Sequence, residues 1–368
     1  MESLSLQIQK SFPGFRLDVK LEVGTGIHAL FGPSGVGKTQ TLECISGLTR
    51  PDRGLIRLGE RVLFRELPGQ PRIDLKPRSR QIGYVVQDGA LFPHKTLLEN
   101  VCYPLEKRGL EPLDKARSLL SEMGLGHLGN RLPSEVSGGQ KRRAAIARAL
   151  AFEPSLLLLD EPFVHLDQVV LTKLMNDLAQ TVSHHRIITL LVTHDLDVAA
   201  RIAETIWLMD RGEIIQSGTT SDVLFKPATG EIARLLGNVN LLEGSVLDER
   251  SGVWRVRTSE IVWQVPHMGN LERGQKVELM IRTGAVKIVK PGVELPTSLG
   301  LNLQQATVQS VDKRPDLSFV VFDLLEGLSL TGRVPTDSWD RTGLRAGARC
   351  QIAVSIDGLA LFEPSALT

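Results

Sequence analysis

The chain has 368 residues, of which 42% are hydrophobic and 23% charged, and its formal net charge is +1. These values are ordinary for a globular protein of two or three domains, and they exclude a chain-wide electrostatic attraction to nucleic acid or to an anionic membrane surface. The three cysteines lie far apart without metal-ligand spacing, which favours a reducing compartment over a disulfide framework. Because no run of about 18 apolar residues occurs, we predict neither a membrane-spanning helix nor a signal peptide.

A phosphate-binding loop follows the first buried strand. Residues 27–31, IHALF, predict a strand of a parallel sheet covered by helices, and GPSGVGKT at residues 32–39 matches the loop pattern in full. Residues 39–48 have helical apolar spacing, so the loop amides are expected to surround phosphate oxygens at a helix N-terminus. In such a loop Lys38 reaches the β- and γ-phosphates, and the Thr39 hydroxyl binds Mg²⁺. The alternative is a tight glycine turn with a solvated lysine.

Residues 136–150, VSGGQKRRAAIARAL, place two glycines and three basic residues at the start of an alanine-rich helix. Ser137 and Gln140 fit a capping box, in which each side chain satisfies a backbone N–H of the other residue. The box leaves Gly138 and Gly139 unexplained, because each costs about 1 kcal/mol against alanine in a helix. Basic residues are also unfavourable at the positive end of a helix dipole. We therefore predict that a phosphate binds at this helix N-terminus.

Two carboxylates end the next apolar run, LLLL at residues 156–159. Because successive side chains of a strand point to opposite faces, Asp160 and Glu161 cannot share one role. We expect Asp160 to bind the Mg²⁺ of a nucleotide and Glu161 to polarise the attacking water as a general base. A third apolar run, IITLLV at residues 187–192, predicts another strand of the same sheet, and ligands of such sheets bind at the carboxyl ends of strands.

The sequence pattern changes near Gly237. Residues 1–235 mix strand-like and helical segments, whereas residues 236–368 contain short alternating strands separated by Gly, Pro and Asp. We therefore expect an α/β domain followed by a small all-β domain.

The second part contains an internal repeat. The apolar and glycine positions of residues 271–281 recur at identical spacing in residues 344–354, and Asn240-Leu241 is echoed by Asn302-Leu303. We expect two small β modules packed together, at about residues 240–292 and 300–368. Chance recurrence of ordinary strand patterning is the alternative.

Five motifs occur in order along residues 1–235: GPSGVGKT, VSGGQKRRAAIARAL, LLLLDEP, HLD and TH. Together they resemble the ATP-binding subunit of ATP-binding-cassette (ABC) transporters. The resemblance implies an α/β phosphate-loop NTPase domain with a helical subdomain, followed by an all-β, OB-like regulatory domain. It also implies that the chain binds ATP and Mg²⁺ and hydrolyses ATP to drive transport.

The resemblance carries residue roles over motif by motif. Gln87 in YVVQD resembles the glutamine that contacts Mg²⁺ and senses the membrane subunit, His194 in LVTHD the switch histidine on the γ-phosphate, and Asp167 in HLD the D-loop aspartate. An aromatic ring that stacks on adenine is expected near the N-terminus, where both Phe12 and Phe15 fit. The implied catalytic residues are Glu161, His194 and Gln87, and the implied Mg²⁺ ligands are Thr39, Gln87 and Asp160. The implied nucleotide-binding residues are Gly32, Pro33, Ser34, Gly35, Val36, Gly37, Lys38, Thr39, Ser137, Gly138, Gly139, Gln140, Asp167 and Phe12.

In the resembled family the segment VSGGQ, residues 136–140, is the signature motif, and a dimer explains its two glycines. In this family Ser137, Gly138 and Gly139 would bind the γ-phosphate of ATP held by the partner's loop, so a homodimer with two ATP molecules at a symmetric interface is implied. Hydrolysis would open that dimer. Two positions depart from the family pattern: Val136 replaces the usual leucine, and His165 replaces the usual serine near the shared site.

Residues 45–64 and 77–100 are most similar to the ATP-binding subunit of molybdate importers, although Val86 and Gly89-Ala90 depart from that subfamily. The C-terminal halves also resemble its regulatory region, which implies that molybdate or tungstate binds there. Implied partners are two integral-membrane permease subunits, docked at a helical region around residues 91–105, and a periplasmic substrate-binding protein. The chain would be a peripheral protein on the cytoplasmic face of the inner membrane.

Three alternatives remain open. Importers of sulfate, iron, polyamines or sugars have similar regulatory regions. A soluble ABC-type ATPase could act on nucleic acid or ribosomes, but such proteins usually have two cassettes or a coiled-coil insertion. A binding module without turnover would be favoured if Glu161 or His194 were missing.

We do not expect nucleic-acid binding by the β region. Residues 301–368 contain six Lys and Arg against eight Asp and Glu, which is the wrong balance for a groove that follows phosphates. Three tryptophans could stack on bases. Core or interface packing is the role expected of Trp254, Trp263 and Trp339.

Overall fold

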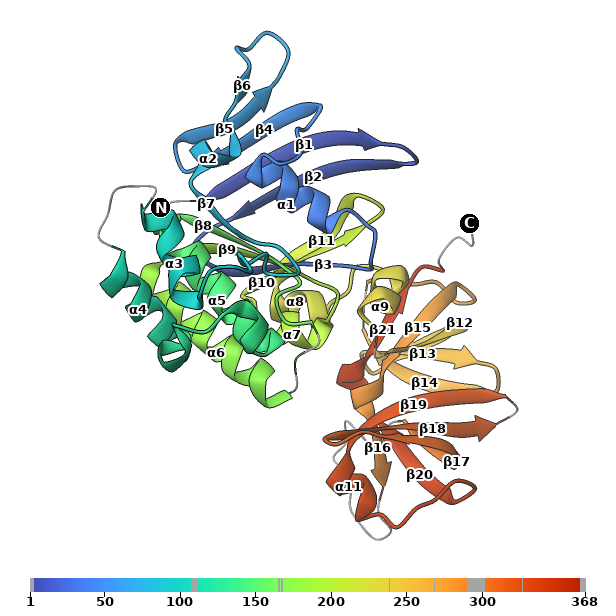
Figure 1. Cartoon of the computed structure of the whole chain (residues 1–368). Helices are drawn as coiled ribbons and strands as arrows, with labels where there is room; N and C mark the ends of the chain where they lie inside the picture. The colour runs from blue at the N-terminus through green and yellow to red at the C-terminus, as the bar shows by residue number, and fades with distance from the viewer. Residues whose placement is uncertain are drawn as a thin grey trace. The chain divides into compact units, whose positions relative to one another are not determined.

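The computed structural model describes residues 3–106, 112–164, 166, 168–237, 239–267, 269–289, 302–325 and 327–364. The chain divides into two compact units, residues 1–226 and 227–368 (Figure 1). Helix α9 (Gly230–Leu236) belongs to the second unit, because its Ala233 packs against Met280 and Ala360. The division therefore lies earlier in the chain than the sequence pattern indicates.

One mixed sheet forms the frame of the first unit. Its order within the described residues is β6-β5-β4-β1-β2-β11-β10-β3-β9-β8-β7 (Figure 1). The strands are β1 (Leu4–Phe12), β2 (Phe15–Val23), β3 (Gly26–Phe31), β4 (Arg53–Leu58), β5 (Arg61–Glu66), β6 (Ile73–Asp74), β7 (Ile82–Val85), β8 (Leu156–Asp160), β9 (Ile188–Thr193), β10 (Thr205–Asp210) and β11 (Glu213–Thr219). Strands β10, β3, β9, β8 and β7 are parallel, whereas β1, β2, β4, β5 and β6 pair antiparallel. The three apolar runs are β3, β8 and β9, so the prediction of buried parallel strands is confirmed.

Two hydrophobic cores lie on opposite faces of the sheet. The helices of this unit are α1 (Lys38–Ser46), α2 (Pro77–Arg80), α3 (Leu97–Glu106), α4 (Leu113–Glu122), α5 (Gly138–Leu150), α6 (Gln168–His185), α7 (Leu196–Ile202) and α8 (Thr220–Phe225), with 3₁₀ turns at Gly126–Leu128 and Pro133–Glu135. On β8, Leu157 and Leu159 pack into the core formed with α3 to α7, while Leu156 and Leu158 pack into the core that contains α1. Strands β1, β2, β4 and β5 contribute to the α1 core. Both halves of the sheet therefore fix the helix that follows the phosphate loop.

The helical subdomain consists of α3, α4 and α5 (Figure 1). Helix α3 begins at Leu97, so the expected helical region around residues 91–105 is irregular up to residue 96. Asn100, which is fully buried, explains this loop: its Nδ2 donates to the backbone oxygens of Phe92 (3.1 Å), Lys95 (3.0 Å) and Thr96 (2.9 Å). The side chain replaces backbone hydrogen bonds that a helix would otherwise supply.

The second unit contains two five-stranded antiparallel sheets, ordered β14-β13-β12-β15-β21 and β16-β20-β17-β18-β19. Their strands are β12 (Val239–Arg250), β13 (Val253–Thr258), β14 (Ile261–Pro266), β15 (Lys276–Arg282), β16 (Val286–Val289), β17 (Leu303–Lys313), β18 (Leu317–Leu325), β19 (Leu328–Pro335), β20 (Arg349–Val354) and β21 (Leu359–Phe362), with helix α11 (Thr336–Asp340) and 3₁₀ turns at Thr283–Ala285 and Ile356–Gly358. Trp254, Trp263 and Trp339 lie in the core that the sheets share, which confirms their expected packing role.

The internal repeat is a structural duplication with exchanged strands. A bulge follows Val246 in β12 and Val308 in β17, and the N–H groups of Gly274 and Gly347 donate to the backbone oxygens of these two valines. The last strand of each repeat joins the other sheet: β16 pairs with β20, and β21 pairs with β15. The sheets therefore do not follow the sequence halves at 240–292 and 300–368, because each module completes the other's sheet.

Two equivalent asparagines connect the modules. Asn240 exchanges hydrogen bonds with the backbone of Thr331, its Nδ2 donating (3.0 Å) and its Oδ1 accepting (2.7 Å). Asn302, which is buried, does the same with the backbone of Gln264, both bonds being 2.8 Å. The asparagine echo in the sequence thus marks corresponding contacts between the halves.

We predict that Asn302→Ala destabilises the second unit by about 1–3 kcal/mol, because it removes both hydrogen bonds between the buried Asn302 side chain and the backbone of Gln264. Urea unfolding of the full chain, followed by tryptophan fluorescence, measures the change. Gln305→Ala, at an exposed position of β17, is the matched control. Equal unfolding midpoints for the two variants would contradict the role given to Asn302.

Candidate active site

Four neighbouring parallel strands bring the predicted site residues to one edge of the sheet. The phosphate loop follows β3, His194 follows β9, Asp160 ends β8 with Glu161 directly after it, and Gln87 lies just beyond β7. Carboxyl ends of parallel strands are where ligands bind in such sheets. The sheet order therefore gathers segments that are up to 160 residues apart.

The phosphate loop is closed by its own lysine. Lys38, which is 6% exposed, donates from Nζ to the backbone oxygens of Gly32 (2.8 Å) and Pro33 (2.7 Å). Burial lowers the pKa of Lys38, and the charges of Glu161 and Asp160 act in the opposite direction. No side chain caps the N-terminus of α1, so its first N–H groups can bind an anion.

Gly37 is required by close packing. Its φ of 107° lies in a region that residues with a side chain rarely adopt, and an added Cβ would lie 2.7 Å from Cζ of Phe15. Phe15 thus supports the loop, and its ring lies 5.8 Å from that of Phe12 across the turn between β1 and β2. Both rings are half-buried, so both remain available for an adenine contact.

Asp160 faces the loop. Its Oδ1 accepts a hydrogen bond from the Thr39 hydroxyl at 3.2 Å, and burial raises the pKa of its carboxyl group. Burial raises the pKa of the Tyr84 phenol on β7, and the nearby charge of Asp160 acts in the same direction. Sequence reasoning missed Tyr84, although it stands in the YVVQD motif three residues before Gln87.

These groups fit Mg²⁺ bound together with a nucleotide. The ion takes one or two carboxylates together with phosphate and water oxygens, and Thr39 and Asp160 offer one hydroxyl and one carboxylate at hydrogen-bond distance. Within the described ranges no three His, Cys, Asp or Glu residues cluster to hold a metal.

Glu161, which directly follows β8, faces His194. Its Oε1 lies 2.7 Å from Nδ1 of His194, and its N–H donates to the backbone oxygen of Val192. Its φ of 47° is unusual for a residue with a side chain, and such strain is concentrated at functional sites. The second oxygen, Oε2, is buried and has no hydrogen-bond partner among the described residues. A water molecule held there would satisfy it.

The signature segment has the predicted capping box. Ser137 N–H donates to Gln140 Oε1 at 2.8 Å, and Gln140 N–H donates to Ser137 Oγ at 3.3 Å. An added Cβ on Gly138 would meet open space, whereas one on Gly139 would lie 2.9 Å from Cγ1 of Val170. Packing against the described residues therefore explains Gly139 but not Gly138.

The basic residues after the signature need a different explanation from the anion that we expected. Arg142 donates to the backbone oxygen of Val164, and Arg143 donates to that of Met123 at 3.2 Å. Two of the three basic side chains thus join α5 to neighbouring backbone, and Lys141 is the one left for an anion. Gln87 is exposed in the turn after β7. The predicted Asp167, like His165, lies outside the described residues.

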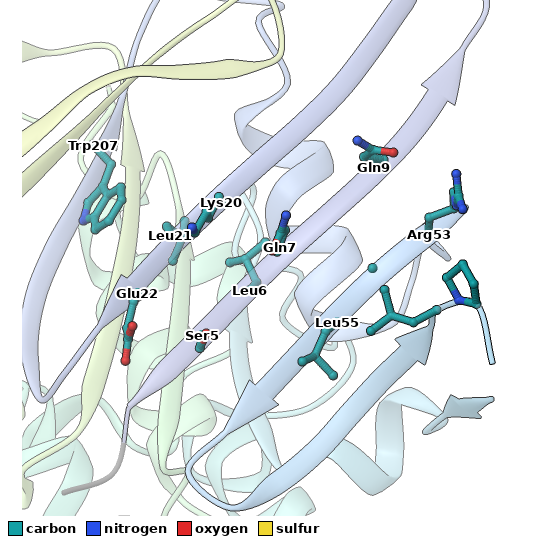
Figure 2. Close-up of a pocket in the computed structure, with 13 residues that line it drawn as sticks. Ser5, Leu6, Gln7, Gln9, Lys20, Leu21, Glu22, Arg53, Leu55 and Trp207 are labelled. Atoms are coloured by element: carbon teal, nitrogen blue, oxygen red, sulfur yellow. The ribbon is translucent and has the colours of Figure 1, made fainter. Parts of the chain in front are cut away.

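A separate groove of about 500 Å³ lies on the open face of the antiparallel strands (Figure 2). Gln7, Lys20, Leu55 and Trp207 are among its lining residues, and none of the predicted site residues is. No helix in the described ranges has the length and apolar character needed to cross a membrane.

Comparison with known proteins agrees with this geometry. The ABC transporter family matches residues 16–164. A molybdate/tungstate import ATP-binding protein of Pyrococcus horikoshii is 32% identical over 362 residues, which cover 96% of this chain and 98% of that protein. The chain belongs to the ABC transporter family. A molybdenum import ATP-binding protein of Brucella melitensis is 32% identical over 99% of this chain and 100% of its own length. An Fe(3+) ions import ATP-binding protein of Brucella abortus is 36% identical over 76% of this chain and 78% of its own length.

This ABC subunit is thus an ATPase coupled to transport, which confirms the family and the activity expected from the motifs. The phosphate-loop unit and the OB-like β unit confirm the expected fold class. Subunits of this family bind ATP and work with membrane permeases and substrate-binding partners.

We predict that Glu161→Gln abolishes most ATP hydrolysis while ATP binding remains. The amide keeps the side-chain volume near His194 but cannot accept a proton, so general-base catalysis, typically worth about 10²–10⁴-fold, is lost. Steady-state phosphate release and the binding of a fluorescent ATP analogue test the two halves of this statement. A variant that hydrolyses ATP at the wild-type rate would exclude Glu161 as the base.

The two signature glycines should respond differently to alanine. Gly139→Ala should lower the free energy of unfolding by about 1–3 kcal/mol, because the methyl group overlaps Val170. Gly138→Ala has room within the chain, so stability should be unchanged while ATPase activity falls. Urea unfolding and phosphate release on both variants measure this contrast. Full activity of Gly138→Ala would argue against close approach of a ligand.

Proposed function

We propose that the chain is the ATP-hydrolysing subunit of an importer of oxyanions, with molybdate as the first candidate. The observation that carries the substrate class is the extent of similarity. The molybdate/tungstate and molybdenum import relatives align over 96% and 99% of this chain, including the β unit, whereas the iron import relative aligns over 76%.

At the nucleotide site, α1 and the loop from Gly32 to Thr39 bind the phosphates of ATP, with Lys38 on the β- and γ-phosphates. Thr39, Asp160 and Gln87 hold Mg²⁺, which neutralises developing charge on the phosphates when bound. Glu161 orients the attacking water and accepts its proton. His194, at 2.7 Å from Glu161, holds this carboxylate in place and reaches the γ-phosphate.

Adenine stacks on an aromatic ring of the first hairpin, for which we keep Phe12 as the proposed residue. The 5.8 Å separation of the Phe12 and Phe15 rings supports the proposal, because Phe15 is already packed on the loop and Phe12 lies beside it. A ring in this position adds contact area without specific hydrogen bonds.

The active unit is a homodimer, in which Ser137, Gly138, Gly139 and Gln140 of one copy complete the ATP site of the other. The open space over Gly138 supports this arrangement, since none of the residues that the structure describes lies within 4 Å of a Cβ built there. Asp167 would lie at the same shared site. Two copies related by a two-fold axis would bury two ATP molecules.

Two permease subunits and a periplasmic substrate-binding protein complete the transporter, and the chain acts as a peripheral protein on the cytoplasmic face of the inner membrane. The permease contact is the loop of residues 91–96 with α3. We further propose that molybdate or tungstate binds the β unit and regulates the ATPase.

Transport by the reconstituted complex tests the function. With the chain, its permease and its substrate-binding protein in vesicles, ATP should drive accumulation of molybdate and tungstate but not of Fe³⁺. The Glu161→Gln subunit is the control and should give none. Accumulation of Fe³⁺ alone would show that the chain belongs to an iron importer. ATP hydrolysis without accumulation of any ion would favour a soluble ATPase.

A further inference from the structure

The segment that follows Gln87 has a strained backbone. Gly89 has φ 71° and Ala90 has φ 43°, so two successive residues are left-handed. For a residue with a Cβ this conformation is strained, because the Cβ comes too close to the following carbonyl oxygen. Such strain persists only where surrounding contacts impose it, so some group must hold residues 88–92.

Arg148, on the last turns of α5, holds this segment. Its Nη1 donates to the backbone oxygen of Ala90 at 2.8 Å, and its Nη2 donates to that of Gly89 at 3.0 Å. The centre of the guanidinium lies 5.5 Å from the centroid of the Phe92 ring. The backbone oxygens of both left-handed residues thus accept hydrogen bonds from the same planar guanidinium group, a geometry that a lysine could not reproduce.

The described contacts of the Arg148 side chain are with backbone carbonyl groups and an aromatic ring. Burial lowers the pKa of this guanidinium, and the contacts described for it are two carbonyls and the Phe92 ring. Hydrogen bonds donated by a charged group are stronger than neutral ones. The contact is therefore a specific attachment of this segment to α5 and not a surface ion pair.

Helix α5 and the segment also pack directly on each other. A Cβ on Gly89 would lie 3.3 Å from Cβ of Ala145, which is closer than side chains normally approach. On the other side, Asn100 of α3 accepts from the N–H of Phe92 at 2.8 Å. Residues 88–92 are therefore clamped between α5 and α3, just after Gln87.

The same helix begins at the signature. Ser137 caps its N-terminus, and Arg148 lies eleven residues later, a rise of about 16 Å along a continuous helix. The two ends of α5 are therefore joined by continuous helix, which can transmit a displacement of residues 88–92 to Gly138 and Gly139.

We propose that Arg148 is a positioning residue that couples the segment after Gln87 to the signature, so that the state of the Gln87 turn decides where Ser137, Gly138 and Gly139 are presented. The proposal rests on the proposed function of the signature in a second ATP site. Arg148 acts through backbone contacts and touches neither nucleotide nor Mg²⁺.

Arg148→Lys tests the coupling in the full chain. It keeps the charge but loses the fork, so the ATP affinity should stay within about twofold while kcat falls about tenfold or more. Without nucleotide, hydrogen exchange should become faster at residues 88–92 and change also at residues 137–141. With ATP and Mg²⁺, in the Glu161→Gln background, the protection seen at residues 137–141 in the parent should be lost.

A second variant breaks the clamp from the other side. Gly89→Ala places a methyl group against Ala145 and leaves Arg148 intact. It should reproduce the fall in kcat, and the double variant should lose less than the product of the two single effects, because both act on one contact. Arg143→Lys on the same helix is the matched control and should retain wild-type kcat. The Arg143 guanidinium donates to the backbone oxygen of Met123, just after α4, and not to residues 88–92.

Three results would overturn the proposal. The first is wild-type kcat and wild-type exchange at residues 137–141 in Arg148→Lys. The second is a variant that loses ATP binding and thermal stability together, which would make Arg148 merely structural. The third is strict multiplication of the Arg148→Lys and Gly89→Ala effects. A wild-type chain that hydrolyses no ATP would instead refute the proposed function, and the nucleotide-free exchange would still decide whether the two segments are coupled.

Discussion

The parallel pairing of β3, β9 and β8 is the constraint on which the active site depends. Because β9 lies between the other two, the phosphate loop, His194 and the carboxylates Asp160 and Glu161 meet at one edge of the sheet. Asp160, the last residue of β8, faces Thr39, and Glu161, directly after the strand, faces His194. A shift of one residue in the pairing of β8 with β9 would turn the Asp160 side chain to the other face of the sheet.

Two cores keep that pairing in register. On one face of the sheet, the core that contains α1 holds the helix that follows the phosphate loop. On the other face, the helical core holds α5, which begins at the signature. Arginines of α5 extend this control to backbone that has no regular structure, at Val164, Gly89 and Ala90. The catalytic edge and the signature helix are therefore parts of one mechanical unit, although they are far apart in sequence.

Sequence reasoning succeeded where a function depends on a local pattern. The phosphate loop, the apolar strands and the capping box at Ser137 each occupy a few consecutive residues, and the structure contains all of them. It failed where the decisive contact is long-range. Nothing near Arg142 shows that its donor meets Val164, and the exchange of β16 and β21 between sheets cannot be read from two repeats that are alike. Likewise the loop of residues 91–96 has helical spacing, and only the buried Asn100 makes it irregular.

The central claim is that each ATP site is completed by a second copy of the chain. Sedimentation velocity of the full-length Glu161→Gln chain, with and without ATP and Mg²⁺, tests it most directly. We predict a monomer without nucleotide and a dimer at saturating ATP, with ADP unable to replace ATP. A chain that binds ATP but remains monomeric at protein concentrations on the order of micromolar, where a specific complex would form, would contradict the account.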